Sequence, residues 1–114
     1  MPAQSRLLRT AIAALLLTSA AACREIRDPI VVKDAMLVLE NQSAGEWRNV
    51  RITINDHFSG GAPLLPAGGL LTAPLRDFQS GFGHRFDRSR MTVFKVRVTA
   101  TDANGRAVTL SWGK

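Results

Sequence analysis

The chain has 114 residues, and its 15 lysine and arginine residues exceed its nine acidic residues, which gives a formal charge of +6. After the N-terminal segment described next, this length is enough for one domain. The sequence contains one cysteine, Cys23, so the chain cannot form an internal disulfide.

Residues 1–22 are typical of a cleavable export signal. Arg6 and Arg9 precede an apolar run of 12 residues from Ala11 to Ala22. Crossing a bilayer takes about 20 apolar residues, so this run is too short to be a membrane span, whereas it fits the apolar core of a signal peptide. The alternative, an N-terminal amphipathic or buried helix, is disfavoured because the run lacks a polar face.

Cys23 directly follows Ala20-Ala21-Ala22. This arrangement resembles the lipobox of bacterial lipoproteins, in which the cysteine becomes the lipid-modified first residue of the mature chain. The resemblance covers only the signal segment, and Ala20 departs from it because the family usually has leucine there. It implies membrane attachment through acylated Cys23, and Arg24 in place of aspartate implies the outer membrane. The alternative is an ordinary A-x-A cleavage site with a freely soluble exported product.

Removal of residues 1–22 leaves 92 residues with 13 basic and nine acidic side chains, a formal charge of +4. A basic cytosolic chain would suggest nucleic acid as a partner, but export excludes that partner. Anionic envelope components remain, such as phosphorylated lipids, cell-wall polymers or acidic proteins. We interpret residues 23–29 as a short tether and residues 30–114 as the domain.

From Ile30 onward, apolar and polar residues alternate with a period of two, which predicts strands. In the clearest early segment Val50, Ile52 and Ile54 share one face, and Trp47 is out of phase with them, so we expect it to be exposed or at a bulge. Gly60-Gly61 is expected to break the chain. The strands expected before residue 76 cover residues 30–32, 36–39, 47–55, 62–65 and 70–75.

A hairpin is predicted at the C-terminus, where two alternating segments flank Asn104-Gly105, a pair favoured in tight turns that need positive φ. Its apolar residues are expected to form one continuous buried face. They are Phe94, Val96, Val98, Val108, Leu110 and Trp112.

Residues 76–90 are ambiguous, because Phe78, Phe82 and Phe86 recur every four residues as on a helix face. Gly81 and Gly83 disfavour a helix. We therefore predict a loop with one irregular strand whose aromatic residues plug the edge of the core, with a short helix as the alternative.

Six to eight short strands separated by turns predict an all-β, antiparallel sandwich. The strand ending at Glu40-Asn41, the strand from Trp47 to Asn55 and the turn from Leu65 to Gly68 resemble the small immunoglobulin-like or fibronectin-like domains of bacterial envelope proteins. The disulfide-and-tryptophan core of antibody domains is absent, because Cys23 lies outside the domain.

The sequence shows no catalytic or metal-binding constellation. His57 and His84 have Asp56 and Asp87 nearby, but zinc sites need three or four ligands at recognisable spacings, so we expect solvated histidines, no metal and no cofactor. Ser59 lacks the flanking glycines and strand–turn–helix context of a nucleophile elbow.

Arg85, Arg88 and Arg90 form the densest basic cluster and are the candidate contact for an anion or partner, because the planar guanidinium suits phosphate and carboxylate. The alternative is a solvated loop balanced by Asp77 and Asp87. We expect Trp112 to be a core residue, with sugar stacking as the alternative for both tryptophans.

The sequence therefore favours an envelope lipoprotein whose sandwich is a non-catalytic binding or structural module. Its expected partners are the membrane, through Cys23, and an anionic envelope component or a protein. The alternative is an exported or anchored enzyme, or an accessory subunit of one.

Overall fold

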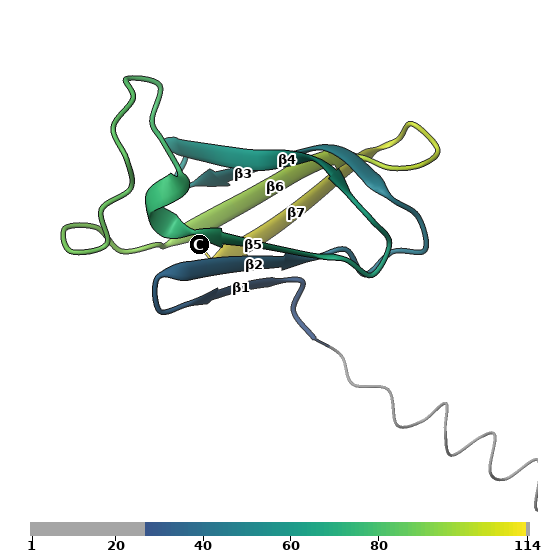
Figure 1. Cartoon of the computed structure of the whole chain (residues 1–114), viewed down its shortest axis with the longest axis horizontal. Helices are drawn as coiled ribbons and strands as arrows, with labels where there is room; N and C mark the ends of the chain where they lie inside the picture. Colours follow the sequence, from purple (N-terminus) through teal and green to yellow (C-terminus); the bar gives the residue numbers. More distant parts are fainter. Residues whose placement is uncertain (1–26, 114) are drawn as a thin grey trace, which may run out of the picture.

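The computed structural model describes residues 27–113, and the predicted export signal and Cys23 lie outside this range. It shows an all-β sandwich of two antiparallel sheets (Figure 1), which confirms the predicted fold class. The elements are β1 (Ile30–Lys33), β2 (Met36–Glu40), β3 (Trp47–Ile54), β4 (Phe58–Leu65), β5 (Leu70–Pro74), the 3₁₀ turn η1 (Leu75–Asp77), β6 (Lys95–Thr101) and β7 (Ala107–Gly113).

One sheet has the strand order β1-β2-β5 and the other has the order β4-β3-β6-β7. Every pairing between neighbouring strands is antiparallel. Among the described strands, β1 and β5 are the edges of the smaller sheet, and β4 and β7 are the edges of the larger one.

The core lies between the two sheets and follows the alternation of the sequence. Leu37 and Leu39 of β2 are fully buried, and from the other sheet so are Ile52 of β3 and Val98 of β6. Burying an aliphatic side chain of this size stabilises the fold by about 1.5–3 kcal/mol. These residues therefore supply much of the free energy that holds the sheets together.

The predicted break at Gly60-Gly61 is wrong, because β4 runs through both glycines without interruption. Their role is close packing. A Cβ built on Gly60 would meet the ring of Phe78 at 2.9 Å, and one built on Gly61 would overlap the carbonyl oxygen of Val50. The glycines therefore let the strand approach its neighbours, which a sequence reading of glycine as a chain breaker does not show.

Trp47 is buried, with 5% of its surface exposed, so the expectation of an exposed tryptophan is wrong and the bulge alternative is confirmed. The register between β3 and β6 shifts between Arg48 and Arg51, and Asn49 has a φ of +52°. The extra residue of a bulge changes the phase of the strand, which turns Trp47 to the same side as Val50.

The C-terminal hairpin is confirmed, with β6 and β7 paired from Lys95↔Gly113 to Thr101↔Ala107. Asp102 organises its turn, because its side chain accepts hydrogen bonds from the N–H groups of Asn104 and Arg106, both at 2.9 Å, and only Gly105 takes a positive φ (79°). A type I turn followed by a left-handed glycine is a common hairpin connection.

The prediction is wrong for one residue of the expected buried face of this hairpin. Phe94 is 56% exposed, because strand pairing begins only at Lys95 and Phe94 belongs to the preceding loop. Val96 and Val98 are fully buried, whereas the apolar residues of β7 are half-buried and pack against the core. The buried face is thus continuous across β6 and incomplete at β7, the outermost strand.

Candidate functional site

The candidate site is built by the segment between β5 and β6 at one end of the sandwich (Figure 1). Pro74 ends β5 and precedes η1, which turns the chain across this end. The N–H of Leu75 donates a 2.8 Å hydrogen bond to the carbonyl oxygen of Ala35, in the turn between β1 and β2. This bond holds η1 against the end of the smaller sheet.

The rest of the segment is held by two buried aromatic residues. Phe78 and Phe86 are 1% and 2% exposed, and the ring of Phe86 meets that of Phe58 edge-on, with centroids 5.3 Å apart. Gln79 exchanges backbone hydrogen bonds of 2.8 and 3.1 Å with Ser59 of β4. The segment is therefore anchored to both sheets at fixed points.

This geometry confirms the predicted loop with aromatic plugs for two of the three phenylalanines. Phe82 is 92% exposed at the tip of the loop, so its predicted place at the core edge is wrong. The loop doubles back between Ser80 and His84, whose backbone groups form a 2.8 Å hydrogen bond, and this reversal carries Phe82 away from the core. The spacing of four residues does not reflect a helix.

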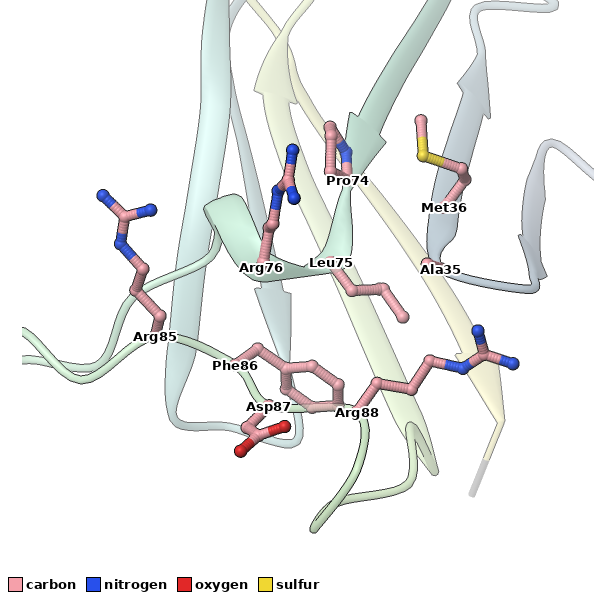
Figure 2. A pocket seen from close by; sticks show the side chains of 9 residues that line it. All are labelled: Ala35, Met36, Pro74, Leu75, Arg76, Arg85, Phe86, Asp87 and Arg88. Atoms are coloured by element: carbon pink, nitrogen blue, oxygen red, sulfur yellow. The ribbon is translucent and has the colours of Figure 1, made fainter.

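Below η1 lies an open groove with a volume of about 650 Å³. In Figure 2, Leu75 and Phe86 face each other at its centre, and three guanidinium groups extend away from them in different directions. Its apolar lining is formed by Ala35, Met36, Pro74, Leu75 and Phe86, and its charged lining by Arg76, Arg85, Asp87 and Arg88.

The one carboxylate that lines the groove, that of Asp87, accepts hydrogen bonds from its own loop. The hydroxyl and the N–H of Ser89 donate to Oδ1 of Asp87 at 2.6 and 3.0 Å. These hydrogen bonds, and to a lesser degree the charge of Arg90 with its Nε 3.8 Å from Oδ2, lower the pKa of the Asp87 carboxyl. Asp87 is thus ionised at neutral pH and interacts with Ser89 and Arg90.

The arginines of the groove keep a net positive charge. Within residues 27–113, Arg76, Arg85 and Arg88 form no ion pair with a carboxylate. All three side chains are exposed. The groove therefore combines an apolar floor with an uncompensated basic rim.

The structure brings together two of the three arginines singled out from the sequence and adds a third. Arg85 and Arg88 line the groove, whereas Arg90 is paired with Asp87 and is not part of the lining. Arg76 was missed, because it lies nine residues before Arg85 in the sequence. The buried Phe78 and Phe86 were a usable signal, since burying both requires the chain to return and bring its flanking arginines together.

The remaining sequence candidates do not gather at this groove. His57 lies in the turn between β3 and β4, His84 lies in the exposed loop, and neither lines the groove. Across residues 27–113 no three metal-ligating side chains come together. Trp112 is half-buried against the core, as expected for a core residue at the end of β7.

The first described residues lie at the opposite end of the sandwich from the groove (Figure 1). Arg27 forms a 3.2 Å ion pair with Glu40, the last residue of β2, whereas Met36 at the start of the same strand lines the groove. In the part of the chain that the structure describes, no helix has the length and apolarity of a membrane span.

Comparisons with protein-family models, with curated proteins and with solved structures found no match.

Proposed function

We propose that this chain is an envelope lipoprotein, anchored through acylated Cys23, whose β-sandwich is a non-catalytic module that binds an extended polyanion. The arginine-rimmed groove carries this proposal. Arg76, Arg85 and Arg88 are exposed, without carboxylate partners among the described residues, and surround an apolar floor.

The directions of the arginines favour an extended ligand over a single small anion. Figure 2 shows the three guanidinium groups spread around Leu75 and Phe86, so they do not converge on one point. A partner with several separated carboxylates or phosphates can contact all three, and its apolar portions can lie on the floor. Acidic polymers and acidic protein segments have this chemistry.

The charged residues of the groove suit binding better than proton transfer. Arginine stays protonated at neutral pH and serves only as a hydrogen-bond donor. The lowered pKa of Asp87 keeps that carboxyl ionised, far from the near-neutral pKa that suits a general acid or base. A binding module therefore accounts for the groove without requiring a reaction.

The position of the groove is compatible with an anchor at Cys23. Four peptide units separate Cys23 from Arg27, and a fully extended chain spans at most about 3.6 Å per residue. The anchor would therefore lie near the Arg27 end of the sandwich, and the groove at the other end would stay accessible.

The experiment compares two triple variants with the same change in net charge. Arg76→Gln/Arg85→Gln/Arg88→Gln removes the basic rim, and Arg51→Gln/Arg97→Gln/Arg106→Gln removes three arginines that also form no ion pair among the described residues and lie outside the groove. We expect the groove variant to elute from immobilised polyglutamate at a clearly lower salt concentration than wild type, and the control variant to elute near wild type. Equal losses in the two variants would show that net charge alone drives retention.

A second measurement distinguishes a polymer from a membrane surface. Vesicles containing phosphatidylglycerol present a flat anionic surface, which cannot enter a groove at depth. We expect the groove variant to lose polyglutamate binding while its weak, charge-driven vesicle binding falls no more than that of the control. A loss confined to vesicles would contradict the polyanion assignment.

A further inference from the structure

The four sheet edges of this sandwich are not protected equally. An unpaired edge strand presents free N–H and C=O groups, and proteins protect such edges by short length, proline, charge or an added partner. β1 has four residues and ends in Lys33, and β5 has five residues and ends in Pro74. β4 contains Pro63 and is paired on its outer side, at Ser59, by Gln79.

β7 has none of these protections within the described residues. It is seven residues long, from Ala107 to Gly113, and contains neither proline nor a charged side chain. Among the described strands, its one partner is β6. The long unprotected edge and the half-buried Val108, Leu110 and Trp112 lie on the same strand.

The hydrogen-bond pattern identifies the backbone groups that face outward. The N–H of Asp102 donates to the carbonyl oxygen of Arg106 at 2.9 Å, so this pair is bonded across the hairpin. Because bonded and non-bonded pairs alternate in an antiparallel ladder, Val108, Leu110 and Trp112 bond to β6. The backbone groups of the intervening residues, such as Thr109 and Ser111, then point to the free edge.

We propose that β7 pairs with β7 of a second copy of this chain, in an antiparallel, two-fold symmetric dimer centred on Leu110. The inference does not depend on the proposed function. The dimer joins two four-stranded sheets into one continuous eight-stranded sheet. A symmetric contact of this kind requires a strand that is complementary to its own reverse.

β7 meets this requirement in its sequence. About Leu110, the pairing places Val108 opposite the partner's Trp112 and Thr109 opposite the partner's Ser111. Apolar side chains therefore lie opposite apolar side chains, and hydroxyl groups lie opposite hydroxyl groups. Thr109 and Ser111 carry the outward-facing backbone N–H and C=O groups, which form the hydrogen bonds of the new strand pair. The same register places the partner strand over the half-buried apolar residues of β7.

The test uses disulfide trapping of the full chain in intact bacterial cells treated with diamide. Leu110→Cys places two cysteines in a directly opposed, non-hydrogen-bonded pair, where Cβ atoms are about 4.5–5.5 Å apart. We expect a disulfide-linked dimer as the main species on a non-reducing gel. Wild type, with Cys23 alone, and Thr99→Cys, an exposed position on the neighbouring β6, should run as monomers on the same gel, because neither places two cysteines opposite each other at the seam.

Two further variants keep the proposal falsifiable if Leu110→Cys disturbs the core. Co-expressed Thr109→Cys and Ser111→Cys chains, altered only on the exposed face, should cross-link to each other. Adding Thr109→Lys/Ser111→Lys to Leu110→Cys places like charges directly opposite across the seam and should reduce the dimer several-fold. Absence of a dimer in both cysteine designs, equal cross-linking of Thr99→Cys, or a dimer unaffected by the lysines would overturn the proposal.

Discussion

Asn55, which follows β3, is expected to be a polar residue whose loss strongly weakens this fold. Its side chain joins three backbone groups at the start of β6. Nδ2 donates to the carbonyl oxygen of Thr92 at 2.9 Å, and Oδ1 accepts from the N–H groups of Phe94 and Lys95 at 2.9 and 3.2 Å. The residue is 8% exposed and has a φ of +52°.

Asn55→Ala removes all three hydrogen bonds and places a less tolerant residue in the left-handed region. Each bond contributes about 0.5–1.5 kcal/mol, and the left-handed conformation costs a residue such as alanine about 1 kcal/mol. We therefore expect a loss of roughly 2.5–5.5 kcal/mol from a total of about 5–15 kcal/mol. For a domain of this size each kcal/mol corresponds to about 4–8 °C in Tm.

Two related variants separate these contributions. Asn55→Gly loses the same hydrogen bonds without the conformational strain, so it should be about 1 kcal/mol more stable than Asn55→Ala. Asn49 also has a φ of +52°, but its side chain is exposed and forms no hydrogen bond within the described residues. Asn49→Ala should therefore report the strain alone, at about 1 kcal/mol.

The measurement is urea unfolding of the purified protein, followed by circular dichroism and tryptophan fluorescence, with thermal melts as a second probe. The expected order of stability is wild type, then Asn49→Ala, then Asn55→Gly, then Asn55→Ala. An Asn55→Ala variant that loses no more stability than Asn49→Ala would refute the assignment of this side chain as the link between β3 and β6.

Two other predictions concern the strand faces and the predicted export signal. Val98 is fully buried and Arg97 is exposed. Val98→Asp should therefore prevent accumulation of folded protein, whereas Arg97→Asp should change the free energy of unfolding by less than about 0.5 kcal/mol. Equal shifts in thermal melts would contradict the assignment of Val98 to the core face and Arg97 to the solvent face. Wild type should incorporate an alkyne fatty acid and partition with membranes, and Cys23→Ser should abolish both; wholly soluble wild type with an unmodified thiol would exclude the lipoprotein.

The sequence was sufficient to predict the strands whose environment differs on their two faces. The alternation of Val96 and Val98 with Lys95 and Arg97 on β6 required only a period of two, because a slip of one residue would expose the whole apolar set. Trp47 shows the limit of this reasoning. The extra residue of a bulge shifts the alternation of side chains between the two faces of the strand, and the local sequence does not mark it clearly.

The loop between β5 and β6 shows what local pattern cannot supply. Phe82 and Phe86 are the same residue type at a regular spacing, yet one is 92% exposed and the other 2%. The difference depends on the ring of Phe58 and on the pairing of Gln79 with Ser59, contacts with a distant strand. The same contacts place Arg76 and Arg85 at the same groove, although they are nine residues apart in the sequence. The candidate site was therefore predictable only in part.

The direction of β7 determines where the two grooves of the proposed dimer lie relative to each other. Antiparallel pairing about Leu110 makes the β7 strands of the two sandwiches run in opposite directions, which places the two grooves at opposite ends of the joined sheet. An extended polyanion that spans both ends binds two sites at once, and such linkage can raise avidity 10²–10⁴-fold, roughly, without a new contact. The two Arg27 ends are also opposed, so chains anchored in one membrane would hold the joined sheet with its strands along the membrane plane. Thr109→Lys/Ser111→Lys should therefore weaken binding to long polyglutamate much more than binding to a short oligomer that reaches only one groove.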